Sequence, residues 1–206
     1  MSISDYLENA ILNASLRNVS LAVATPYVAL FTANPGETGA SGEATGGSYA
    51  RQAATFNVPA SGLSDNVALI SYTNMPASTI THIAIFDAVS AGNMLYAGAL
   101  GGTQHFFSAN ATTDVFTAYG HGLVNDDRVE FEEAQAGSLP TGITAGTLYY
   151  VISATTDTYQ VSLTSAGAAV NFTTSGQGVA TYVNAKVVNA GDTFQVAAGD
   201  LDVSLF

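Results

Sequence analysis

The spacing of apolar residues changes after Thr25 and Pro26. Before this point apolar residues recur with helical spacing, at Ile3, Leu7, Ala10, Ile11 and Ala14. After it, short runs rich in β-branched and aromatic residues alternate with clusters of Gly, Asn, Asp and Ser, which is typical of antiparallel strands joined by turns. We therefore predict a mainly β fold, an antiparallel β-sandwich or barrel-like domain with one N-terminal helix.

A change in residue pattern within the series of predicted strands indicates a second domain. Residues 103–182 contain turn-rich stretches such as "YGHGLVNDDRVEFEE", whereas the end of the chain returns to the plain hairpin pattern of its beginning. An insertion at an exposed loop tip is tolerated because the two ends of the host chain stay close. We therefore predict a discontinuous outer β domain of residues 1–102 and 183–206, with a small all-β domain of residues 103–182 inserted in it.

The balance of charge excludes some partners. Sixteen Asp and Glu against four Lys and Arg give a formal net charge of −12, so we expect neither nucleic acid nor an anionic membrane surface as a partner. No apolar run approaches the roughly 18 residues of a membrane span. Charged residues make up only 10% of the chain, against about 25% in an average protein, which indicates that part of the surface is covered in an assembly.

The stretch "ANPGETGASGEATGGSYARQAATF", from Ala33 to Phe56, has the glycine content of a phosphate-binding loop. It contains no Lys and no G-x-G-x-x-G spacing, and it leads into a predicted strand rather than a helix, so neither a Walker loop nor a dinucleotide site fits. We interpret it as a long mobile loop whose glycines adopt turn conformations that other residues avoid.

No catalytic group is identified in the sequence. The G-x-S-x-G elbow of many serine hydrolases is absent, and the three histidines lie on separate segments. His82 alternates with apolar residues, which predicts a half-exposed strand position, and His121 between two glycines predicts a turn. Paired carboxylates for glycoside cleavage stay open because their separation in space defines them, but the chain has no Trp to line a long sugar groove. We predict that the protein is not an enzyme and has no cofactor.

The acidic run "NDDRVEFEE", Asn125 to Glu133, has the highest density of oxygen ligands. Asp126, Asp127 and Glu130 are the candidate ligands for Ca²⁺, although their spacing is not that of an EF-hand. As a strand, "RVEFEE" would place Glu130 and Glu132 on one face, and charges on a solvated strand edge discourage unwanted pairing. We favour the solvated edge.

Three blocks of the outer domain resemble a family of small tailed-bacteriophage virion proteins that are often described as tail-fibre-like. The blocks are "YVALFTANPGETGASGEATGGSYARQAATF", "ITHIAIFDAVSAGNMLYAGAL" and "NAGDTFQVAAGDLDVSLF", and members of the family begin with a helix similar to "YLENAILN". The G-G-S-Y-A-R-Q block is the most specific part. In it, Tyr49, Arg51 and Gln52 are candidate contacts between subunits, with Arg51 as the anchor to a carboxylate.

Residues of the predicted insert resemble a small β-module that recurs in phage tail and surface proteins. The segments that carry the resemblance are "AYGHGLVNDDRVEF", "LPTGITAGTLYYVI" and "TDTYQVSLTSAGAAVNFTTSGQG". Such modules imply a spacer or a displayed adhesion domain. No catalytic residues carry over from either resemblance.

Together the resemblances imply a structural protein on the outer surface of a tailed-phage virion, made in the cytoplasm of the bacterial host. The outer domain would attach to the major capsid protein or other virion proteins and form a homotrimer, while the insert would project. We favour a capsid decoration (cement) protein because the chain lacks the heptads or long repeats of a fibre shaft. The alternatives are a tail-fibre or tail-tip component, or an adhesion module that binds a host surface glycan through Tyr-rich loops such as "LYYVISATTDTY".

Overall fold

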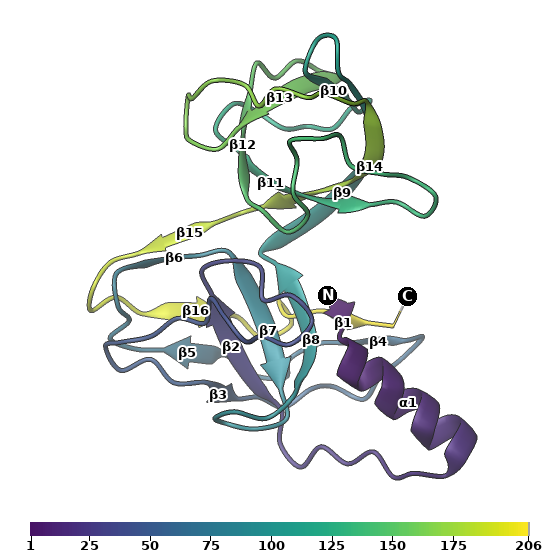
Figure 1. Cartoon of the computed structure of the whole chain (residues 1–206). Coiled ribbons are helices and arrows are strands. Elements are labelled where there is room, and N and C mark those ends of the chain that lie inside the picture. Colours follow the sequence, from purple (N-terminus) through teal and green to yellow (C-terminus); the bar gives the residue numbers. More distant parts are fainter. Residues whose placement is uncertain (206) are drawn as a thin grey trace. The chain divides into compact units, whose positions relative to one another are not determined.

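The computed structural model describes residues 1–205 and divides the chain into two compact units (Figure 1). Unit 1 comprises Met1–Leu100 and Ala185–Phe206, and unit 2 comprises Gly101–Asn184. Phe206, the last residue of the predicted outer domain, lies outside the described residues. The fold is mainly β, with antiparallel sheets and one helix, which confirms the predicted fold class.

A five-stranded antiparallel sheet forms the centre of unit 1. In spatial order its strands are β1 (Ser2–Ile3), β8 (Met94–Ala99), β7 (His82–Phe86), β2 (Tyr27–Phe31) and β3 (Gln52–Ala53). Every residue of β7 is buried, because a strand with an unbroken apolar run can be covered on both faces. The predicted half-exposed position of His82 is therefore wrong, since this side chain is 2% exposed and its Nδ1 lies 2.9 Å from Thr81 Oγ1.

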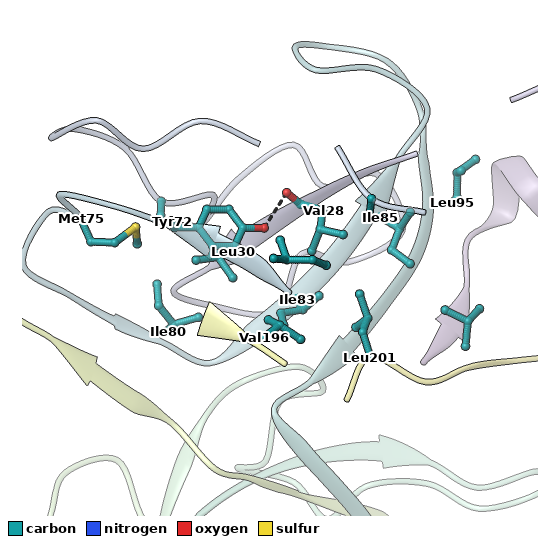
Figure 2. Packing of buried hydrophobic residues seen from close by; sticks show 14 of the residues in the cluster. Val28, Leu30, Tyr72, Met75, Ile80, Ile83, Ile85, Leu95, Val196 and Leu201 are labelled. Atoms are coloured by element: carbon teal, nitrogen blue, oxygen red, sulfur yellow. Dashed lines mark hydrogen bonds between the residues drawn. The ribbon is translucent and has the colours of Figure 1, made fainter. Parts of the chain in front are cut away.

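The C-terminal segment completes unit 1 by running antiparallel along residues 63–80. The strands of the earlier segment are β4 (Leu63–Ser64), β5 (Ile70–Tyr72) and β6 (Ser78–Ile80), and they pair with β17 (Val203–Ser204), β16 (Phe194–Val196) and β15 (Lys186–Val188), respectively. The three pairings are therefore nested. Apolar side chains from both segments pack against one face of the central sheet, as Figure 2 shows for Ile80, Ile83 and Val196. The Tyr72 hydroxyl donates to the Val28 carbonyl at 2.8 Å across this core.

The opposite face of the central sheet carries a second buried cluster, which includes Phe31, Phe86 and Met94. The glycine-rich loop lies over this cluster, because the Thr32 N–H donates to the Gly42 carbonyl at 2.8 Å and a Cβ atom added to Gly39 would stand 2.5 Å from the Phe86 ring. Positive φ angles at Gly36, Gly39, Gly42, Gly46 and Gly47 confirm the predicted turn conformations of this loop.

The helix α1 (Asp5–Arg17) confirms the predicted N-terminal helix. The Ser4 side chain caps its first turn by accepting the Leu7 N–H at 3.3 Å, and Asn18 ends it in the left-handed conformation. Leu7 is the buried residue of the helix, whereas Leu12 and Leu16 are exposed. None of the helices within residues 1–205 is both long and apolar enough to span a membrane.

Unit 2 is a closed antiparallel barrel of six strands. In order around the barrel they are β10 (Val115–Thr117), β13 (Thr158–Ser162), β12 (Tyr149–Ile152), β11 (Arg128–Glu133), β14 (Gly176–Val183) and β9 (Gly101–Asn110). Because β11 pairs with β12 on one side and β14 on the other, the predicted solvated edge at "RVEFEE" is wrong. Closure removes the edge, and Glu130 is only 4% exposed.

Aromatic side chains fill the barrel. Phe116 is fully buried at their centre, with ring centroids 4.7 Å from Phe131 and 5.1 Å from Tyr159 in stacked geometry. Phe107 and Phe172 meet the Phe116 ring edge-on at 5.0 and 4.9 Å. Such pairs add to the free energy of burial, so unit 2 has an apolar core of its own.

We predict that unit 1 folds without the barrel. Gly101 and Val183 are partners in the β9–β14 ladder, so the two ends of unit 2 are adjacent and a short Gly-Ser turn can join Leu100 to Ala185. The shortened chain should show a cooperative thermal transition and a β-type circular dichroism spectrum. As a companion, residues 101–184 expressed alone should also unfold cooperatively. An insoluble or non-cooperative shortened chain would contradict the independence of unit 1.

Candidate functional site

Arg51, one of the candidate assembly residues, is bound within its own unit. Its guanidinium group forms a two-point ion pair with Glu43, with Nε 2.9 Å from Oε1 and Nη2 2.8 Å from Oε2. Nη1 donates to the carbonyls of Ala91 and Ala88 at 2.7 and 3.2 Å. The guanidinium carbon lies 3.5 Å from the centroid of the Phe86 ring, which adds a cation–π contact. The Arg51 side chain is 8% exposed and fastens the glycine-rich loop over the sheet.

Tyr49 extends this network into the core. Its hydroxyl donates to Glu43 Oε1 at 3.0 Å and accepts the Leu30 N–H at 3.0 Å. Its ring stacks on Tyr72 with centroids 5.8 Å apart. Burial raises the pKa of Tyr49 well above its ordinary value of 10, and the nearby Glu43 charge raises it further. The hydroxyl therefore stays protonated and keeps both hydrogen bonds at neutral pH.

All three candidate assembly residues therefore make contacts inside unit 1. Gln52, in β3, donates from Nε2 to the Ala50 carbonyl at 2.8 Å, while Tyr49 and Arg51 both bind Glu43. The carboxylate that Arg51 was expected to find is thus supplied by the same chain, eight residues earlier. Contact of these residues with another subunit stays a prediction.

The three candidate metal ligands lie in different surroundings. Asp126 sits in a turn with φ 71° and accepts the Ser165 hydroxyl at 2.7 Å, and Asp127 Oδ2 accepts the Val124 N–H at 2.8 Å. Glu130 lies buried in β11. Across residues 1–205, no group of three or more His, Asp or Glu side chains is arranged to hold a metal ion. Asp126 and Asp127 hold loops of the barrel in place, and a cation site stays an expectation from the sequence.

A cluster that sequence reasoning missed joins two histidines in the barrel. The β9–β10 pairing sets Ser108 opposite Thr117, and His105 in β9 meets His121 in the loop that follows β10. Their ring centroids are 5.9 Å apart, and His105 Nε2 lies 3.1 Å from the hydroxyl of the buried Tyr159. No local motif signals this meeting, because the two histidines lie on separate segments of the barrel.

A hydrogen bond to His121 identifies the tautomer of its neutral ring. The Leu123 N–H donates to His121 Nδ1 at 3.0 Å, so a neutral His121 carries its proton on Nε2, an atom that is buried and has no hydrogen-bond partner among the described residues. A histidine that binds a metal usually donates from its other nitrogen, so this geometry does not suit a metal ligand. Burial first, and the neighbouring His121 second, lower the pKa of His105 to about 4.

We predict that Arg51→Ala lowers the free energy of unfolding of unit 1 by about 2–4 kcal/mol, because Glu43 loses its partner and the Phe86 ring loses its cover. The free energy of unfolding of Arg51→Lys should lie between those of the parent protein and Arg51→Ala, since lysine keeps the charge but not the two-point geometry. Urea unfolding would measure both. The matched control is Arg17→Ala at the exposed end of α1, with an expected change of about 0.5 kcal/mol or less. Equal midpoints for Arg51→Ala and Arg17→Ala would contradict the structural role of Arg51.

We also predict that acid destabilises the barrel through His105. The folded-state pKa of about 4 lies below the ordinary value of 6.5, so the unfolded chain binds more protons between these values. The stabilising contribution is present above pH 6.5 and is lost as the pH falls toward 4. Thermal unfolding of unit 2 between pH 7.5 and 4.5 would measure this loss, and His105→Gln should show a shallower pH dependence. An unchanged pH dependence of the thermal midpoint in His105→Gln would contradict the role of His105.

Comparison with known proteins gives one family. The family model described as Podophage GP4 fiber I protein gp80 matches residues 2–118. These residues include α1, the strands β1 to β8 and the barrel strands β9 and β10. No match was found among curated proteins. Because the matched residues make up more than half of the 206-residue chain, the protein belongs to the family of the podophage GP4 fiber I protein gp80.

Proposed function

We propose that the protein is a non-enzymatic component of the tail fibre of a tailed phage, on the outer surface of the virion. Membership of a phage fibre family makes it a structural protein of a virion. The observation that carries the finer assignment is the match over residues 2–118, whose family description names a fibre protein. The net charge of −12 supports a position away from packaged nucleic acid.

Capsid decoration is the second candidate. Within residues 1–205 the helix has 13 residues, and the strands belong to compact sheets and a barrel. A fibre shaft usually needs heptads or long repeats that wind identical chains together. The compact units therefore support a capsid cement role, in which the protein would bind the major capsid protein.

We further propose that the protein forms a homotrimer through apolar surface. Leucine and valine side chains are exposed on α1 and on the segment that follows it, at Leu12, Leu16, Val19 and Leu21. Exposed apolar side chains that lie close together in the chain favour an interaction surface. Because each copy carries the same negative charge, apolar contacts rather than ion pairs would have to supply most of the association free energy.

We predict a copy number per virion on the order of tens, as cyclic fibre assemblies require, rather than the hundreds of a capsid lattice. Quantitative mass spectrometry of purified virions, scaled to the major capsid protein, would measure it. Immunogold labelling of intact particles should mark the tail and not the head. Hundreds of copies with label over the head would instead establish the decoration role, and absence from purified virions would contradict both candidates.

A further inference from the structure

The C-terminal half of α1 and the segment after it are weakly covered by the rest of unit 1. Leu7 near the start of the helix is buried, and Ala10 and Ile11 pack partly against the core. Leu12 and Leu16, one turn apart, are 55% and 77% exposed. From the end of α1 the chain runs back toward the central sheet without regular structure (Figure 1). A helix of 13 residues is marginal in water without packing, so a partner that covers this half would stabilise it.

A groove runs between α1 and the returning segment, which together form an arm of residues 5–22. The volume of the groove is about 430 Å³. The Val19 N–H joins its two walls by donating to the Asn13 carbonyl at 3.3 Å. Its lining includes Tyr6, Asn9, Ala10, Asn13, Val19 and Leu21. None of the side chains in the lining is charged, so the groove suits an apolar side chain of a partner.

The arm also exposes a side chain that fits such a groove. Leu16 lies in the last turn of α1, whereas Tyr6 and Asn9 of the groove lie in its first two turns. The projecting leucine and the recess are therefore at opposite ends of one helix. A protein with a projection and a matching recess on different parts of its surface can bind identical copies head to tail. Such contacts form a ring when the rotation between copies closes.

Charge favours the same head-to-tail contact. Arg17 in the last turn is exposed, and its Nη1 donates to Asn13 Oδ1 at 3.1 Å. The first turn carries Asp5 and Glu8, and the Asp5 N–H donates to a third carboxylate, that of Glu37, at 3.0 Å. A last turn placed beside the first turn of the next copy brings Arg17 to these carboxylates and pairs opposite ends of the two helix dipoles. Parallel helices would instead bring the acidic turns together.

We propose that in the homotrimer the last turn of α1 of each copy occupies the groove of the next copy. Leu16 then lies between Tyr6 and Leu21 of the neighbour, and Arg17 lies beside the neighbour's Glu8. The contact supplies the apolar burial that association of acidic chains requires. It rests on the proposed homotrimer, because an antiparallel pair of arms would satisfy the same charges but form a dimer, and the experiment separates the two.

Disulfide cross-linking of the full-length protein tests this contact, because the chain has no cysteine of its own. One variant carries Leu16→Cys, a second carries Asn9→Cys and a third carries both. Positions seven residues apart in one helix are separated by about 10 Å along its axis, which a disulfide cannot span, so bridges form only between copies. After oxidation we expect a covalent trimer from the double variant and monomers from each single variant on a denaturing gel.

Substitutions on the arm should weaken assembly as measured by sedimentation velocity. Leu16→Asp should raise the protein concentration at half-assembly at least about tenfold. Arg17→Glu should raise it as well, and adding Glu8→Arg to Arg17→Glu should lower it again toward that of the parent protein. The matched control is Val58→Asp, since Val58 is 90% exposed in unit 1 outside the arm, and it should leave assembly unchanged. The circular dichroism spectrum of each variant checks that it is folded.

Three results would overturn the proposed contact while leaving the homotrimer or another oligomer in place. They are covalent dimers from Leu16→Cys alone, a ladder of longer covalent chains from the double variant, and a trimer that is insensitive to Leu16→Asp. A parent protein that stays monomeric would overturn both the contact and the homotrimer. The copy number per virion and the site of immunogold labelling are independent of these results, so failure of the fibre role is distinguishable from failure of the contact.

Discussion

Burial of strands β2 and β7 on both faces is the constraint on which unit 1 depends. A sheet centre made of apolar residues on both sides needs two covers, and the chain supplies them from separate segments. The nested pairing of residues 63–80 with the C-terminal segment covers one face, and the glycine-rich loop covers the other. Arg51 closes the second cover by binding Glu43 and stacking on Phe86.

Unit 2 meets the same need in a different way. Closing six strands into a barrel buries one face of each strand around Phe116 and leaves no free edge. The strands thereby form the framework of the barrel, and the sequences of the loops between them can vary. Two of these loops, residues 118–127 and 153–157, also bind each other, because the Gly120 N–H donates to Asp157 Oδ1 and the Ala154 N–H donates to Asn125 Oδ1.

The local features of the chain were predictable, whereas the environments of single side chains were not. Ser4 and the apolar spacing of the first residues predict α1, and the glycines after Ala33 predict backbone with positive φ. His82 and Glu130 were placed at solvent by strand alternation, and both are buried. Alternation assumes one wet face, and that assumption fails at His82, whose sheet is covered on both sides. Glu130 is buried although its neighbours Val129 and Phe131 belong to the barrel core. The partners of Arg51 and the meeting of His105 with His121 likewise depend on contacts that alternation does not encode.

The sequence by itself determined the mainly β class, the single helix and the conformations of the loop glycines, because these follow from the period of apolar residues and from the sterics of individual residues. It also determined the acidic character that argues against nucleic acid as a partner. Only the tertiary structure decided which strands pair, that the second set closes into a barrel, and which partners Arg51 and His105 meet. Pairing between segments far apart in the chain depends on which combination of faces can be buried together, and no local pattern carries that information.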